Sequence, residues 1–112
     1  MLVEPNEAFI SCPISNLVLG GFKTMNDITT PYTGLANNHG VRIVRDVATA
    51  IDVDKKQVRL AKGEALSYDR VIVSPGIDFM AGAIPALAGA DAQARVLHAW
   101  KAGPQTVALR RQ

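Results

Sequence analysis

The sequence is poor in cysteine and has no long hydrophobic run. A single cysteine among 112 residues excludes an internal disulfide and any multi-cysteine metal or haem site within this chain. Because no apolar run approaches the roughly 20 residues that cross a bilayer, we expect no membrane insertion. The net charge of +2 is too small to indicate nucleic-acid binding. We interpret Lys101, Arg110 and Arg111 as a solvated helix face.

The composition is otherwise that of an ordinary globular protein. Apolar residues make up 48% and charged residues 20%, which favours neither disorder nor a coiled coil. A chain of this length holds one core. No signal peptide is recognisable, since Met1 runs directly into Leu2-Val3-Glu4 without a basic n-region or an apolar h-region. The chain is therefore expected either to be cytosolic or to have its true beginning upstream of Met1.

The N-terminal part predicts a strand followed by a short helix. Residues 2–4 have the pattern of the end of a short buried strand, which Pro5 closes because proline cannot continue the ladder. Ser15 or Asn16 is suited to cap a short helix, and Gly20-Gly21 is suited to end it. No Ser-His-Asp arrangement, paired-carboxylate site or metal-ligand spacing stands out along the chain.

The middle of the chain has a β pattern. Residues 41–46 and 57–60 alternate with period two, and residues 47–53 are rich in β-branched side chains. Polar turns between these segments predict an antiparallel meander. Residues 71–73 are apolar throughout, which is typical of a buried parallel strand, and Gly76 predicts a tight turn after it.

The remaining segments are predicted to be turns, a connection and a final helix. Residues 29–32 indicate a second capped turn, and residues 37–40 indicate a loop. Residues 77–96 are interpreted as a connecting segment because they are rich in alanine, glycine and proline. Gly103-Pro104 predicts a helix from Gln105, since proline suits the first helical turn.

Two stretches resemble a known family. Glu4 and residues 9–21 resemble the second strand and the following segment of the flavoprotein subunit of flavocytochrome c sulfide dehydrogenase. Residues 67–77 resemble the strand and glycine turn that close the FAD domain in the wider pyridine nucleotide-disulfide oxidoreductase superfamily. Residues 98–103 are also similar to that subunit, just before its pyridine-nucleotide-like domain. The resemblance covers essentially the whole chain in the right order.

The resemblance implies an α/β fold, part of a Rossmann-like FAD-binding domain with an antiparallel β-meander. It divides the chain into a partial FAD-binding domain over residues 1–96 and a connection with the start of the next domain's first helix over residues 97–112. The first βα unit, with its Gly-x-Gly-x-x-Gly turn, and the redox disulfide of the family are missing from this chain. We therefore expect a fragment with no catalytic residue of its own.

The resemblance also implies cofactor-binding residues. Glu4 is expected to accept hydrogen bonds from the adenosine ribose of FAD, although by itself it is a glutamate at a strand end. Asn16 falls near the flavin in the resemblance and is otherwise helix punctuation. The Ser74-Pro75-Gly76 turn is expected to approach the flavin closely, which glycine permits because it has no Cβ; the alternative is ordinary turn chemistry. His39 is expected to be solvated.

Cys12 has three interpretations. In the resembling subunit, a cysteine in this motif joins the 8α carbon of the isoalloxazine ring through a thioether, so that FAD is held covalently. In coenzyme A disulfide reductases and NADH peroxidases, a lone cysteine in a similar loop cycles through a mixed disulfide or a sulfenic acid. A buried inert thiol is the third interpretation. Pro13 favours the first, since the reductases usually carry glycine beside that cysteine.

The resemblance implies a function for the full-length protein. It would oxidise sulfide at the flavin and pass electrons one at a time to a c-type cytochrome subunit in the bacterial periplasm. A cytosolic pyridine-nucleotide-disulfide reductase that uses Cys12 as its redox thiol is the enzymatic alternative. The non-catalytic alternative is a fragment that binds no flavin alone and self-associates through exposed sheet edges. His98 and Trp100 are expected to pack the connecting segment.

Overall fold

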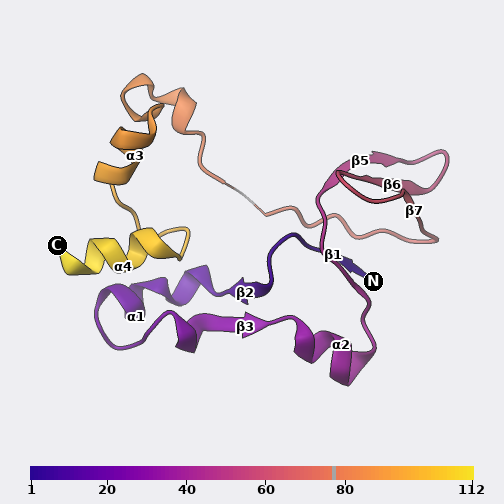
Figure 1. Cartoon of the computed structure of the whole chain (residues 1–112), viewed down its shortest axis with the longest axis horizontal. Helices are drawn as coiled ribbons and strands as arrows, with labels where there is room; N and C mark the ends of the chain where they lie inside the picture. The colour runs from indigo at the N-terminus through magenta and orange to yellow at the C-terminus, as the bar shows by residue number, and fades with distance from the viewer. Residues whose placement is uncertain (77) are drawn as a thin grey trace. The chain divides into compact units, whose positions relative to one another are not determined.

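The chain folds into short strands and helices, and after residue 67 the regular elements of the described residues are helices and 3-10 turns only (Figure 1). The computed structural model describes residues 1–76 and 78–112. Ile77, the last residue of the predicted glycine-turn stretch, lies outside the described residues. Two compact units are present: the first comprises Met1–Phe9 and Pro31–Pro75, and the second comprises Ile10–Thr30 and Gly76–Gln112. The predicted boundary between residues 96 and 97 stays a prediction.

A parallel pair of two-residue strands opens the first unit. Strand β1 (Leu2–Val3) lies beside β4 (Ile43–Val44), with Leu2 opposite Ile43 and Val3 opposite Val44. The strand predicted at residues 2–4 is thus confirmed, although it is half-buried. The strand predicted over 41–46 is shorter than expected. The N–H of Asp46 donates to Val44 O at 3.0 Å, which turns the chain away from β1.

A second short pairing joins β2 (Ala8–Ile10) to β3 (Thr29–Pro31). The division between the two units falls within these two strands.

The predicted antiparallel meander is confirmed. Strands β5 (Ala48–Asp52), β6 (Gln57–Leu60) and β7 (Leu66–Ser67) form one sheet in that order. Every described pairing in it is antiparallel, and buried Val58 lies in the central strand. Alternation with period two places one face of each strand inward, which is why the sequence pattern located β6 correctly.

The buried carboxylate of Asp46 holds the start of the meander. Its side chain is 7% exposed. Oδ1 accepts a hydrogen bond from Val47 N at 2.7 Å, and Oδ2 accepts bonds from Lys62 N at 3.1 Å and Gly63 N at 2.8 Å. Burial by itself raises the pKa of Asp46, but these backbone N–H groups favour the charged form and lower the pKa overall.

Residues 37–40 are not the loop that the sequence predicted. Helix α2 (Thr33–His39) continues through both asparagines and ends at Gly40, whose φ of 63° is the left-handed conformation that glycine adopts easily. The N–H of Gly40 donates to Ala36 O at 3.0 Å. Asparagine is common in loops, but here it occupies the exposed last turn of a helix that the glycine closes.

Residues 71–73 do not form the predicted buried strand. Val71, Ile72 and Val73 belong to no described strand and are 40%, 93% and 61% exposed. Among the described residues, no backbone hydrogen bond joins residues 70–76 to another segment. An all-apolar strand requires neighbouring strands at its edges and cover on its faces, and the described chain supplies neither. The apolar pattern therefore predicted neither the secondary structure nor the burial of this segment correctly.

The second unit is built around two helices. Helix α1 (Ser15–Leu19) follows the 3-10 turn η1 (Cys12–Ile14) and packs against α4 (Pro104–Arg111). The core consists of Val18, Ile28 and Ala102. The unit also contains the 3-10 turns and helix η2 (Asn26–Ile28), η3 (Ala81–Ala83), η4 (Pro85–Leu87) and α3 (Ala90–Arg95).

Two small polar side chains are buried where α1 and α4 meet the preceding segment. Ser15 is 2% exposed, and its Oγ donates to Ala99 O at 2.8 Å. Helix α1 begins at Ser15, and its N-cap is Ile14 without a side-chain capping bond, so neither Ser15 nor Asn16 caps the helix as predicted. Thr106 is fully buried, and its Oγ1 accepts a bond from Gly103 N at 3.2 Å. The final helix begins at Pro104, one residue before the predicted Gln105.

We expect Asp46→Asn to destabilise the protein in a pH-dependent way. The folded pKa of Asp46 is below its ordinary value of 3.8, so the carboxylate stabilises the fold above that value and loses this effect as the pH falls through the folded pKa. The urea midpoint of the variant should be lower than that of wild type at about pH 7, and the difference should shrink as the pH falls below 3.8 and through the folded pKa. A difference that is unchanged across this range would contradict the role of the charge.

We expect Ser15→Ala to lower the free energy of unfolding by about 1 kcal/mol, because the substitution removes the bond to Ala99 O. Urea denaturation followed by circular dichroism measures the change. Asn16→Ala, at the exposed neighbouring position of the same helix, is the matched control. It should be neutral or slightly stabilising because alanine favours helix. Equal losses in the two variants would mean that the buried hydroxyl has no special role.

Candidate functional site

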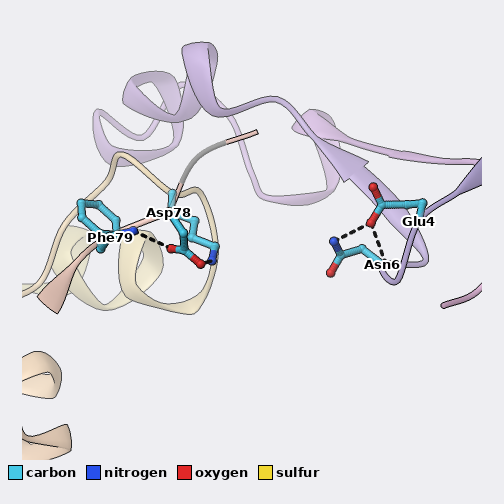
Figure 2. A network of polar contacts seen from close by, with 5 residues as sticks. Glu4, Asn6, Asp78 and Phe79 are labelled. Atoms are coloured by element: carbon cyan, nitrogen blue, oxygen red, sulfur yellow. Dashed lines mark hydrogen bonds and ion pairs between the residues drawn. The ribbon is translucent and has the colours of Figure 1, made fainter. Parts of the chain in front are cut away.

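Glu4 directly follows β1, at the position where a Rossmann-type fold carries an acidic residue after a strand. Its Oε1 accepts two hydrogen bonds from Asn6, from the backbone N at 2.8 Å and from Nδ2 at 2.7 Å (Figure 2). Both bonds use the same oxygen. A ribose diol that bound this carboxylate would therefore have to share it with Asn6.

Arg45 fixes the loop that follows Glu4. Its guanidinium donates to the carbonyl oxygens of Asn6 and Glu7, the latter at 3.1 Å. It also lies over the ring of Tyr32, with Cζ 5.4 Å from the ring centroid, which is cation–π geometry. Burial, followed by the charge and hydrogen bond of Glu4, raises the pKa of Tyr32. Sequence reasoning missed Arg45, because in an alternating segment it resembled an outward-facing strand residue.

Cys12 lies at the start of η1, on the loop between β2 and α1. The loop is anchored by Ser11, whose N–H donates to Ile28 O at 2.9 Å, and Pro13 stiffens it from the next position. The thiol is exposed, and its Sγ lies 3.8 Å from Ile10 O. Cys12 is therefore not buried, contrary to that part of the third interpretation, and the inertness of its thiol stays a prediction. The thioether and redox interpretations both need an accessible thiol, and both stay predictions.

The remaining predicted cofactor residues lie at exposed positions. The side chain of Asn16 is exposed, and its backbone oxygen accepts the bond from Gly20 N at 2.9 Å that ends α1. Ser74 and Pro75 are exposed residues of the first unit. Gly76 has a φ of 73°, and no described atom lies within 4 Å of where its Cβ would be. A positive φ favours glycine by itself, and the choice between flavin approach and ordinary turn chemistry stays a prediction.

The structure places the six predicted residues in two groups. Glu4, Ser74 and Pro75 belong to the first unit, and Cys12, Asn16 and Gly76 belong to the second. Cys12 and Asn16 are brought together by the continuous η1–α1 segment, where Ser15 N donates to Cys12 O. Among the described residues, no hydrogen bond or ion pair joins Glu4 to Ser74 or Pro75. Cofactor binding by these residues stays a prediction.

Phe79, His98 and Trp100 form an aromatic cluster, of which the sequence predicted only the packing of His98 and Trp100. Phe79 packs on His98 with ring centroids 4.3 Å apart and on Trp100 at 5.2 Å. This confirms that His98 and Trp100 pack the connecting segment. Asp78 accepts a bond from Lys101 Nζ at 2.6 Å and another from Phe79 N at 2.8 Å (Figure 2). These two bonds, with that of Lys101 the larger influence, lower the pKa of Asp78.

A small cavity adjoins this cluster within the second unit. Its volume is about 230 Å³, and its wall is mainly apolar. His98 and Gln105 contribute polar groups to the wall, and their Nδ1 and Oε1 atoms are buried without a hydrogen-bond partner among the described residues. The cavity can accept a small apolar group. None of the residues predicted to bind the cofactor lines it.

Residues 1–76 and 78–112 contain no group of three or more His, Cys, Asp or Glu side chains arranged to hold a metal ion. In that part of the chain, no helix has both the length and the apolar character needed to cross a membrane.

The fold belongs to the α/β class, as a partial Rossmann-like arrangement of mixed strands and helices. The chain is similar to the solved structure of the sulfide:quinone oxidoreductase from the hyperthermophilic bacterium Aquifex aeolicus, with a TM-score of 0.55 and 24% sequence identity. The match covers 61% of this chain and 16% of that chain. This likeness confirms the predicted fold class. No family model matches the sequence.

Proposed function

We propose that this chain is part of an FAD-dependent oxidoreductase that oxidises sulfide. The observation that carries the proposal is the structural similarity, at a TM-score of 0.55, to a sulfide:quinone oxidoreductase. That similarity supports the substrate and the oxidoreductase class that the sequence resemblance also implies. Because the chain spans only 16% of the matched protein, the activity is assigned to the whole protein and not to these residues alone.

Cys12 is the residue of this chain that we assign to the flavin. A thioether requires a thiolate that the flavin ring can reach. The thiol of Cys12 is exposed and is therefore accessible to a flavin ring. The loop is held by the backbone bond of Ser11 and stiffened by Pro13. A thioether formed at Cys12 would therefore fix the position of the isoalloxazine ring. FAD, when bound, supplies an acceptor for an electron pair that can release electrons singly.

Glu4 is proposed to bind the ribose of FAD. Its carboxylate lies at the end of β1 and is oriented by Asn6, while Arg45 holds the backbone of the same loop. A carboxylate held in this way needs little reorganisation to accept hydroxyl hydrogen bonds. Asn16, Ser74, Pro75 and Gly76 are proposed to lie near the cofactor in the full-length protein.

We propose a c-type cytochrome subunit as the electron acceptor and the bacterial periplasm as the location. Oxidation of hydrosulfide to zero-valent sulfur releases two electrons and a proton, and the haem takes the electrons one at a time. A covalent link should raise the reduction potential of the flavin, which suits transfer to a haem. The name of the structurally similar protein makes a quinone the competing acceptor.

The exposure of Cys12 also supports a second candidate function. An accessible lone thiol suits a pyridine-nucleotide-disulfide reductase in which Cys12 forms a mixed disulfide or a sulfenic acid. A non-catalytic fragment that binds no flavin alone is the alternative from another class. The chemical state of Cys12 in the protein from its native source separates these three possibilities.

We expect the flavin to remain attached to Cys12 after denaturation. The protein is purified from its native source, denatured and freed of small molecules, and the peptide that contains Cys12 is weighed by mass spectrometry. The peptide should carry the added mass of FAD, and Cys12→Ser should abolish the adduct. Coenzyme A or a sulfenic acid on the peptide would support the reductase, and an unmodified thiol with no bound flavin would support the fragment.

We expect sulfide to reduce a c-type cytochrome through this protein at least about tenfold faster than a soluble quinone analogue, because a raised flavin potential is matched to a haem. Stopped-flow spectra of the native-source protein with each acceptor measure the two rates, and samples without sulfide are the control. Faster reduction of the quinone would replace the cytochrome as the acceptor. No sulfide-dependent reduction of either acceptor would overturn the proposed function.

A further inference from the structure

The cavity beside the aromatic cluster is formed almost entirely by one local segment. All of its lining residues except Gln105 lie between Phe79 and His98. The two ends of this segment are joined to each other. Phe79 packs on His98 with ring centroids 4.3 Å apart, and Asp78 accepts the bond from Lys101 Nζ at 2.6 Å. The cavity therefore depends on contacts within the second unit alone.

Two hydrogen-bonded amides form a fixed polar edge in the cavity wall. Gln93 Nε2 donates to Leu87 O at 3.0 Å, and Gln105 Nε2 donates to Gln93 O at 3.3 Å. All three residues line the cavity. Because the Nε2 group of Gln105 is engaged in this bond, its Oε1 is the polar atom left over, and it is buried without a partner among the described residues. The Nδ1 atom of His98, which also lines the cavity, is in the same state.

These two buried atoms indicate what the cavity lacks. Buried polar groups in folded proteins nearly always have a hydrogen-bond partner, because an unpaired one is costly. An amide oxygen only accepts, so Gln105 needs a donor, whereas the imidazole nitrogen of His98 can donate or accept. Water is a poor occupant, since the wall is mainly apolar and a buried water needs about two to four polar partners. An occupant with an apolar body and an O–H or N–H group suits both the wall and the unpaired atoms.

We propose that the cavity binds a small aromatic molecule that carries a hydroxyl or ring N–H group and has the size of phenol or indole. Its volume of about 230 Å³ is larger than that of an apolar cavity of about 150 Å³ that binds benzene, so a ring with a polar substituent fits. Phe79 and Met80 stand in the wall, and aromatic rings and thioether sulfur both make favourable contacts with a ring.

The donor group of the ligand bonds to Gln105 Oε1. A molecule with acceptors only would leave that oxygen unpaired and should bind more weakly. The inference is independent of the proposed oxidoreductase activity, because none of the residues assigned to the flavin cofactor lines the cavity.

Titration of the 112-residue chain with phenol tests the proposal, and toluene is the matched probe that has the same ring without a donor. NMR spectra follow the backbone amide signals at up to about 5 mM of each probe, a range that detects weak binding. Phenol should bind saturably, with shifts concentrated at residues 79–98. Toluene should bind at least about fivefold more weakly, because the hydrogen bond is lost. Absence of saturable phenol binding, or equal affinity for the two probes, overturns the proposal.

Three variants test the place of binding and the acceptor. Ala81→Phe should abolish phenol binding, because Ala81 lines the cavity and the larger ring fills it. Ala83→Phe is the matched control, since Ala83 is exposed in the same 3-10 turn outside the wall, and it should bind phenol like wild type. Gln105→Met keeps a side chain of similar length without the acceptor and should lose the preference for phenol over toluene.

Circular dichroism verifies the fold of each variant, and the comparison of the two probes on wild type needs no variant. Equal effects of the Ala81 and Ala83 substitutions would place phenol outside the cavity. An unchanged preference for phenol in Gln105→Met would exclude Gln105 as the acceptor. Either result overturns the proposal.

Discussion

The first unit depends on two adjacent charged residues, Arg45 and Asp46, that follow β4. Strands of two residues have too few ladder bonds to hold their own loops in place. Arg45 therefore fixes the loop after β1 through the carbonyls of Asn6 and Glu7. Asp46 fixes the turn between β6 and β7 through the N–H groups of Lys62 and Gly63. The parallel pair and the meander are thus linked by side-chain bonds to backbone more than by sheet continuity.

The second unit solves a similar problem with buried hydroxyls. Its buried apolar core consists of three residues. This is a small core for a unit that contains about half of the residues of the chain. Ser15 and Thr106 add bonds to the backbone at the places where α1 and α4 leave the preceding segments. A buried hydroxyl that is hydrogen-bonded stabilises only modestly, but it also fixes where each helix starts. That placement orients η1, and with it the loop that carries Cys12.

Local patterns in the sequence predicted the local structure and missed what depends on distant partners. The meander followed from alternation and polar turns, and the last helix from Gly103-Pro104. The role of Asp46 depends on backbone groups 16 and 17 residues away, which no local pattern reveals. The apolar run at 71–73 predicted burial because burial is the usual fate of such a run, yet its cover is not among the described residues. For the site, the sequence located the Cys12 loop but not its exposure or the support that Arg45 gives to the loop after Glu4.

The order of the loop around Cys12 bears on which chemistry it serves. A thiol that cycles between a disulfide and a free state has to meet a changing partner, whereas a thiol in a thioether is bound once and then acts as a tether. The Ser11 bond to Ile28 and the neighbouring Pro13 restrain the backbone on both sides of Cys12, which stands at the start of a 3-10 turn. Fixed position is what a tether contributes, because it orients the ring that it holds. Exposure of the thiol is common to both chemistries, and the restrained backbone of its loop is the observation on which our proposal of a covalent flavin rests.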